Sequence, residues 1–215
     1  MKIDKYDWQA RILPSLLAFI PMVWVINNLF FTDLSILETV FFNGISLLLV
    51  LVITLSYLVR EISKFYQDRI FAKSGMPSIY MLMNYEMYFS KDFFKRYVSK
   101  INKSFKYKIN KNDQRSWQEA FELVLADVRD SQFILKLNIR YGFLRNLLGS
   151  VLISWVILFF ATLYLYFWPS NPELLRQALV LLICYSIPIL TMKKVIVKNG
   201  EYFVAKVVSE FVSSK

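Results

Sequence analysis

Long apolar runs dominate the pattern of hydrophobic and polar positions along this chain. A helix needs about 20 mostly apolar residues to cross about 30 Å of hydrocarbon. Four runs approach that length, at residues 12–31, 40–59, 147–167 and 174–192. The first three carry no charge, whereas the fourth carries Arg176 near its start and is followed by Lys193 and Lys194. Because a long basic side chain near a helix end reaches the interface, the pattern predicts four transmembrane helices.

The basic residues predict the orientation of these spans. Residues 1–12, 60–146 and 193–215 together hold 25 of the 26 Lys and Arg residues. The two remaining connections, 32–39 and 168–173, hold none. Since loops rich in Lys and Arg stay in the cytoplasm, both termini and the middle segment are expected to be cytoplasmic. The expected location is a bacterial inner membrane.

The predicted fold class is therefore an all-α integral membrane protein with four transmembrane helices in two hairpins. The expected domains are an N-terminal hairpin (1–59), a basic helical cytoplasmic segment (60–146), a C-terminal hairpin (147–192) and an amphipathic terminal helix (193–215). The second span is expected to continue as a helix until Gly75 and Pro77, which break it. Ser90 and either Asp113 or Ser116 are expected to cap two further helices, and the second of these is expected to continue into the third span.

Composition limits the chemistry available to the chain. Apolar residues make up 56% of it, against roughly 45–50% in an average soluble protein. Histidine is absent and Cys184, expected to be buried, is the single cysteine. These counts exclude His-dependent catalysis, an intramolecular disulfide and a cysteine-cluster metal site. No nucleotide-binding or hydrolase motif is present, so we expect neither an enzyme nor a cofactor.

The densest basic stretch lies in the middle segment. Eight basic residues face one acidic residue, Asp92: Lys91, Lys95, Arg96, Lys100, Lys103, Lys106, Lys108 and Lys111. One interpretation is positive-inside bias with attraction to anionic lipid. Another is a binding site for a nucleotide, an oligonucleotide or another polyanion, with Tyr97, Phe105 and Tyr107 available for stacking. A third is a surface for an acidic partner protein.

Uncharged polar residues and prolines mark the spans. Asn27, Asn28 and Asn43 lie near the outer ends of the first two spans. They either hydrogen-bond within and between helices or line a pore formed by several copies. Pro14, Pro21 and Pro188 weaken helix hydrogen bonding and can kink spans where other groups satisfy the freed carbonyls.

Two juxtamembrane stretches carry a family resemblance. Residues 6–11 read YDWQAR before the first span, and residues 141–149 read YGFLRNLLG at the third. With the four-span layout, they resemble a family of small bacterial membrane proteins with YDxQAR-like and YGFxRN motifs. Such proteins also resemble anti-phage defence effectors that open or disrupt the inner membrane, sometimes under control of a nucleotide. Arg11, Tyr141, Arg145 and Asn146 are candidates either for interfacial anchoring or for coupling cytoplasmic ligand state to the spans.

These observations lead to two hypotheses of function. The first is a homo-oligomeric defence effector in the lipid bilayer that forms an ion-conducting pore, regulated by a nucleotide, an oligonucleotide or a partner at the basic segment. The alternative is a non-conducting membrane anchor or sensor that recruits a cytoplasmic partner protein. The absence of a charged residue in the first three spans disfavours a transporter, because coupling groups in spans are usually ionisable.

Overall fold

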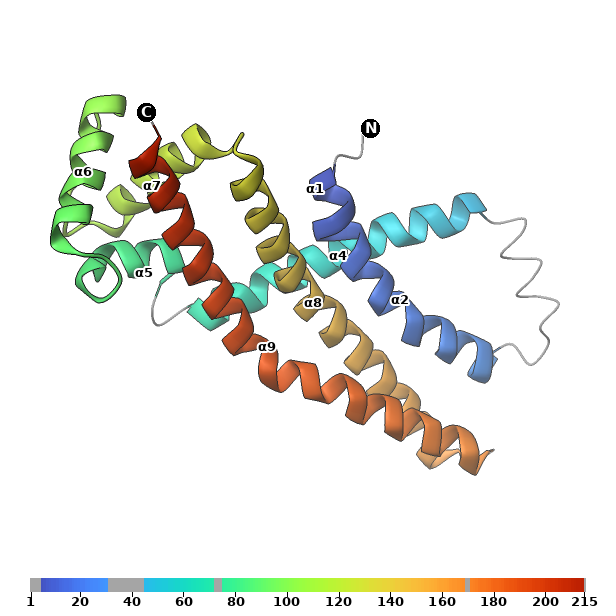
Figure 1. Cartoon of the computed structure of the whole chain (residues 1–215). Coiled ribbons are helices and arrows are strands. Elements are labelled where there is room, and N and C mark those ends of the chain that lie inside the picture. The colour runs from blue at the N-terminus through green and yellow to red at the C-terminus, as the bar shows by residue number, and fades with distance from the viewer. Residues whose placement is uncertain (1–4, 31–44, 72–74, 169–170, 215) are drawn as a thin grey trace. The chain divides into compact units, whose positions relative to one another are not determined.

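The structure is a computed structural model and describes residues 5–30, 45–71, 75–168 and 171–214. All regular elements in these ranges are helical (Figure 1). The N-terminal elements are α1 (Lys5–Asp7), the π-helix η1 (Trp8–Ile12), α2 (Leu13–Val25) and the π-helix η2 (Ile26–Phe30). The remaining elements are α4 (Ile45–Phe71), α5 (Pro77–Met83), the 3₁₀-helix η3 (Tyr85–Met87), α6 (Lys91–Phe105), α7 (Gln114–Val128), α8 (Gln132–Phe167) and α9 (Pro172–Ser213). The expected all-α class is confirmed for the described part of the chain.

Three helical stretches are long and apolar enough to cross a membrane: Trp8–Leu29, Gln132–Phe167 and Pro172–Ser213. In the apolar window of the last stretch only 11% of the residues are buried within the protein. Leu190, for example, is 80% exposed. Hydrocarbon rather than water is the surrounding in which such a helix surface is stable.

The expected second span, 40–59, begins outside the described residues, and α4 covers the part from Ile45. This helix continues to Phe71, which confirms the prediction that it extends beyond position 59. Gly75 follows with a φ of +76°, and its amide donates to the Phe71 carbonyl at 2.7 Å. Glycine adopts this left-handed conformation without steric cost, so Gly75 ends the helix as the sequence indicates.

The chain divides into two compact units. Unit 1 comprises residues 1–67 and 142–193, and unit 2 comprises residues 68–141 and 194–215. The division falls inside α4, α8 and α9, because each of these helices contributes residues to both units. The expected terminal helix at 193–215 is therefore not a separate element, since α9 passes Lys193 and Lys194 without a break.

Unit 2 has an aromatic core built by α5, α6, α7 and the C-terminal part of α9. The expected caps are present, with Ser90 Oγ accepting from the Phe93 amide at 3.4 Å and Asp113 Oδ1 from the Arg115 amide at 3.0 Å. The chain then turns between α7 and α8, so the expected continuous helix into the third span is interrupted at residues 129–131. The core contains Met81, Leu82, Phe94, Tyr97, Ile101, Trp117, Phe121, Val124, Phe203, Val207 and Phe211.

Unit 1 is packed through small residues. A Cβ added to Gly149 of α8 would lie 2.2 Å from Ser63 Oγ and 2.5 Å from the Val59 carbonyl oxygen of α4. These two helices therefore meet backbone to backbone, as helices in membranes commonly do at small residues. Ser63, Ser150 and Ser154 are fully buried. Cys184, in contrast, is exposed on α9, so the expectation that it is buried was wrong.

Candidate functional site

The basic residues of α6 lie on one face of that helix. Phe94, Tyr97 and Ile101 are buried on the opposite face, which leaves the basic face outward. Six outward side chains line a hollow of about 720 Å³: Lys95, Arg96, Ser99, Lys100, Lys103 and Ser104. The hollow thus contains four of the eight basic residues that the sequence suggests for anion binding.

These four basic side chains differ in their ion pairs and hydrogen bonds. Lys95, Arg96 and Lys103 form no ion pair with any residue that the structure describes, although Arg96 lies 5.8 Å from the Phe93 ring centroid. Lys100 instead donates to the carbonyl of Ser214 at the end of α9, and to its Oγ at 2.9 Å. A cation at a helix C-terminus is favoured by the helix dipole, so Lys100 stabilises the end of α9.

The other four predicted basic residues are arranged differently. Lys91 lies 3.8 Å from Glu86 in an exposed ion pair. Lys106 ends α6 in the left-handed conformation, with a φ of +52°. Lys108 and Lys111 are exposed in the connection between α6 and α7. None of these four lines the hollow.

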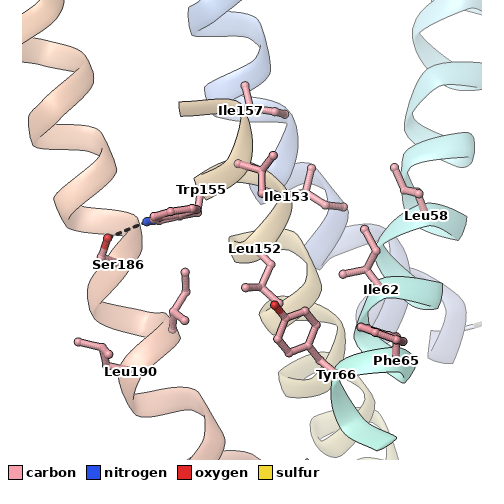
Figure 2. Close-up of a pocket in the computed structure, with 12 residues that line it drawn as sticks. Leu58, Ile62, Phe65, Tyr66, Leu152, Ile153, Trp155, Ile157, Ser186 and Leu190 are labelled. Carbon is pink, nitrogen blue, oxygen red and sulfur yellow. Dashed lines mark hydrogen bonds between the residues drawn. The ribbon is translucent and has the colours of Figure 1, made fainter. Parts of the chain in front are cut away.

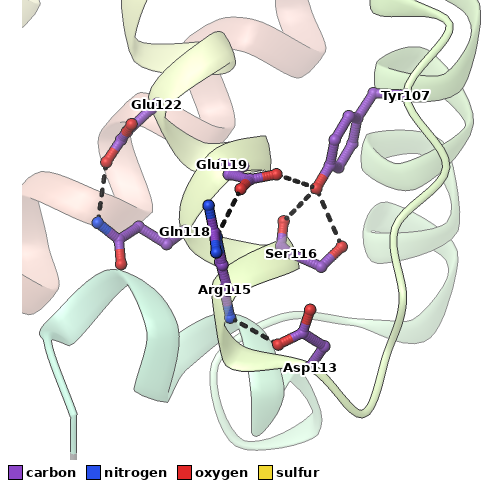
Figure 3. Close-up of polar contacts among 7 residues, drawn as sticks. All are labelled: Tyr107, Asp113, Arg115, Ser116, Gln118, Glu119 and Glu122. Carbon is purple, nitrogen blue, oxygen red and sulfur yellow. Dashed lines mark hydrogen bonds and ion pairs between the residues drawn. The ribbon is translucent and has the colours of Figure 1, made fainter.

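The three aromatic residues suggested for stacking are engaged inside unit 2. Tyr97 is fully buried, its hydroxyl has no hydrogen-bond partner among the described residues, and burial raises its pKa. Phe105 stacks on Phe211 with ring centroids 5.8 Å apart. Figure 3 shows the Tyr107 hydroxyl donating to Glu119 Oε2 at 2.9 Å, beside Ser116 Oγ at 3.2 Å. The sequence interpretation of these rings as stacking surfaces is therefore wrong for Tyr97, which no base can reach.

In unit 1 the two juxtamembrane motifs contact each other. A Cβ on Gly142 would lie 2.9 Å from the Tyr6 hydroxyl oxygen and 3.2 Å from Ala10 Cβ. The buried Asn146 amide donates from Nδ2 to the Ala10 carbonyl at 2.6 Å. The YDWQAR and YGFLRN stretches thus form one helix-helix contact.

Pro14 explains why the Ala10 carbonyl needs this donor. In an α-helix the carbonyl of residue 10 accepts from the amide of residue 14, but proline has no N–H. The sequence at this point forms the π-helix η1. The Asn146 amide of α8 donates to this carbonyl, which is one way in which a neighbouring helix compensates for a proline in a span.

Pro21 has a matching arrangement one heptad later. It removes the amide that the Leu17 carbonyl would accept from, and the hydroxyl of Tyr185 in α9 donates to that carbonyl at 3.2 Å. Both carbonyls therefore accept from a side chain of another helix. The first membrane helix is therefore joined to α8 by an amide and to α9 by a hydroxyl.

The remaining coupling candidates have nearby partners. Arg11 pairs with Asp7 one turn earlier and lies 5.4 Å from the Tyr6 ring centroid. Arg145 Nη1 donates to Gln67 Oε1 at 3.5 Å in unit 1. Tyr141 belongs to unit 2, where its ring stacks on Phe203 with centroids 6.1 Å apart.

The asparagines suggested for a pore are partly described. Asn27 and Asn28 lie in η2, where both are half-buried. The Asn28 amide donates to the Trp24 carbonyl at 2.8 Å, a contact within its own helix. Asn43 lies outside the described residues.

An apolar groove of about 790 Å³ opens in unit 1 between α4, α8 and α9. Figure 2 shows Leu58 and Ile62 of α4 on one side and Leu190 of α9 on the other. Its polar contact joins Trp155 Nε1, the donor, to Ser186 Oγ at 2.8 Å. Such a surface suits a lipid chain or an apolar helix rather than a charged ligand.

Sequence reasoning missed three of these residues. Ser99 and Ser104 share the basic face of α6, and helical spacing from Lys95 and Lys100 was a signal that could have found them. Tyr185 carried no such signal, because 168 positions separate it from Leu17. Only the fold brings these two residues together.

Comparisons of this chain with protein-family models, with curated proteins and with solved structures found no match.

Proposed function

We propose that this protein is a bacterial inner-membrane effector of anti-phage defence that forms a homo-oligomeric ion-conducting pore, regulated by an anionic ligand. The regulating ligand, a nucleotide or oligonucleotide, binds the basic face of α6 in the cytoplasm. The observation that carries the proposal is the hollow with Lys95, Arg96 and Lys103, which have no ion pair within the described chain. Neighbouring like charges repel, so an anion placed there is stabilised by all three.

The membrane part of the proposal has four spans and both termini in the cytoplasm. The three membrane-compatible stretches and the distribution of Lys and Arg support it. Both α8 and α9 run from unit 1 into unit 2. A change in the anion site therefore has a covalent helical route to the spans.

Conduction requires several copies around an axis. The polar side chains of Asn146 and Tyr185 in unit 1 donate to backbone carbonyls inside one subunit. A water-filled path must then come from between subunits, with Asn27, Asn28 and Asn43 as the candidate lining residues. The groove between α4 and α9 offers apolar surface for packing such copies.

The test is a flux measurement on purified protein in vesicles that contain a potassium gradient and a potential-sensitive dye. We expect dissipation of the potential that depends on protein density and changes when tripolyphosphate is added to the side bearing unit 2. The matched control carries Lys95→Gln, Arg96→Gln and Lys103→Gln, which should retain insertion and lose the response to tripolyphosphate. Unchanged potential under all conditions would remove the pore from the proposal.

A specific observation favours the alternative, a non-conducting anchor that recruits a partner protein. No charged residue lies in the described stretches 13–29, 45–59, 147–167 and 177–192 of unit 1. Several polar side chains there donate to backbone carbonyls, as Asn28, Thr162 and Ser186 do. An anchor needs no polar path. Recovery of a stoichiometric cytoplasmic protein with the intact chain, lost in the triple Gln variant and without any change of potential, would favour the anchor.

A further inference from the structure

We infer that the face of α6 recognises phosphate groups and does not recognise bases. The ligand class is a compound with several adjacent phosphates, whether a free polyphosphate, the phosphate chain of a nucleotide or a phospholipid headgroup. This inference deepens the proposed function, on which it rests for the presence of an anion at this face.

The side chains of the hollow form a set of phosphate donors. Lys95, Arg96 and Lys103 provide positive charge, and Arg96 offers a planar fork that binds two phosphate oxygens at once. Ser99 and Ser104 lie among them with exposed hydroxyl groups. Lysine, arginine and serine are the residue types that commonly contact phosphate oxygens in nucleic-acid complexes.

A base-stacking surface is lacking at the same place. None of the residues lining the hollow is aromatic. The Tyr97 ring is buried in the core, and Phe93 is already covered by the Arg96 guanidinium at 5.8 Å. Proteins that bind single-stranded nucleic acid combine a basic groove with exposed aromatic rings, so only the first half of that combination is present on α6.

None of the residues that line the hollow is acidic. Asp92 lies on α6 about one turn before Arg96, and no ion pair joins it to a described residue. Glu86 pairs with Lys91, outside the hollow. The excess of positive charge is therefore concentrated at Lys95, Arg96 and Lys103.

Lys100 differs from the other three basic residues of the hollow because it already has a partner in the chain. Its ammonium group is bound to Ser214 and lies 5.0 Å from the Phe211 ring centroid. A phosphate ligand gains least from this cation, because two of its three N–H donors are already used by Ser214. The structure, and not charge density alone, thus indicates that Lys95, Arg96 and Lys103 contribute most to the affinity for phosphate.

The experiment measures ligand binding to the full-length protein in an uncharged detergent by titration calorimetry. Tripolyphosphate is expected to bind within about threefold of adenosine triphosphate, and adenosine is expected to show no binding. The pair Lys95→Gln and Arg96→Gln should weaken tripolyphosphate binding about tenfold. The matched pair Lys108→Gln and Lys111→Gln, with the same loss of charge, should weaken it less than about threefold, as for exposed ion pairs.

Two results would overturn the inference. One is adenosine triphosphate binding more than about tenfold tighter than tripolyphosphate, which would reveal base recognition. The other is an equal loss of affinity in the two matched pairs, which would show unspecific attraction by net charge. Circular dichroism of each variant confirms that the helices are intact, and the solvent-exposed position of all four residues makes unfolding an unexpected outcome.

A second pair of measurements identifies the phosphate source. The same titration is made in nanodiscs of neutral lipid and in nanodiscs with one-third phosphatidylglycerol. Weaker tripolyphosphate binding in the anionic nanodiscs supports a headgroup as the occupant, and equal binding supports a free phosphate ligand. Because ion flux is not part of these titrations, a phosphate site without conduction and conduction without a phosphate site are distinguishable.

Discussion

The contact between Asn146 and Ala10 allows a direct test of why a buried asparagine lies between membrane helices. The Asn146 amide donates to the Ala10 carbonyl, and we infer that it replaces the donor that Pro14 removes. Substituting Asn146→Leu deletes the amide with little change of volume. Substituting Pro14→Ala restores the backbone donor. The two substitutions should therefore compensate each other.

The expected magnitude follows from burial. Ala10 and Asn146 are both fully buried, and the hydrogen bond measures 2.6 Å. Hydrogen bonds between membrane helices contribute about 0.6 kcal/mol on average and about 1.7 at most, whereas an unpaired buried acceptor costs about 1–3 kcal/mol. We expect Asn146→Leu to lower the free energy of unfolding by about 2 kcal/mol, and by about 1 kcal/mol less in the Pro14→Ala background.

The assay is reversible unfolding in mixed detergent micelles with increasing denaturing detergent, followed by circular dichroism. Asn146→Leu also removes Asn146 Oδ1, which has no hydrogen-bond partner among the described atoms. This removal has the same effect with Pro14 and with Pro14→Ala, so it cancels when the two costs of Asn146→Leu are compared. Pro21→Ala is the matched control. Pro21 lies about 10 Å further along the helix. It leaves the Leu17 carbonyl without its helical donor, and the Tyr185 hydroxyl donates to that carbonyl instead.

We expect Asn146→Leu to couple with Pro14→Ala and not with Pro21→Ala. Conversely, Tyr185→Phe should couple with Pro21→Ala and not with Pro14→Ala. An equal cost of Asn146→Leu in the presence and absence of Pro14 would refute the explanation. Equal coupling to both prolines would show that the substitutions act through general loosening of the first helix.

Three further predictions concern packing, ionisation and the end of α9. Gly149→Leu should lower the free energy of unfolding by about 3 kcal/mol in the same assay, because its side chain would overlap Ser63. A stability equal to that of the unsubstituted chain would contradict the backbone contact. Burial raises the pKa of Tyr97 above its ordinary value of 10.0. Above about pH 10 the tyrosine ionises in the unfolded chain but not in the folded one, so the free energy of unfolding is constant below that pH and falls above it. Tyr97→Phe should flatten that alkaline decline in a pH series, and an unchanged slope would assign the decline to other groups. Lys100→Gln should speed hydrogen exchange in the last turn of α9, since the carbonyl of Ser214 loses its donor, while unchanged exchange would show that the contact does not order the helix end.

Much of the helical pattern could be predicted from the sequence, because burial follows periodicity. The residues at 193–215 were expected to form an amphipathic helix, and Phe203, Val207 and Phe211 on its apolar face are buried. Ser90 and Asp113 cap helices as expected. The end of the fourth span could not be predicted in this way. Two lysines suggested a boundary there, but charge does not interrupt backbone hydrogen bonds, and α9 continues past them.

The candidate sites were predictable to different degrees. Basic residues on α6 were identified from charge density, yet the division between the hollow and the engaged Lys100 depends on where the end of α9 packs. The assignment of Tyr97 to stacking failed for a clear reason. An aromatic ring beside lysines in sequence lies on the opposite side of a helix when it is two positions away, and Tyr97 belongs to the buried stripe with Phe94 and Ile101.

The two proline contacts also bear on how the first membrane helix could respond to a ligand. Ala10 and Leu17 are seven residues apart and therefore lie on one face of the helix, each bonded to a different neighbouring helix. Lipid gives little apolar driving force for helix association, so these bonds contribute directly to fixing the rotation of the first helix. Together they contribute about 1–3 kcal/mol, which matches a typical allosteric coupling free energy. In the Pro14→Ala and Pro21→Ala double variant the two carbonyls are satisfied within the helix, so the bonds to α8 and α9 should contribute less to fixing its rotation.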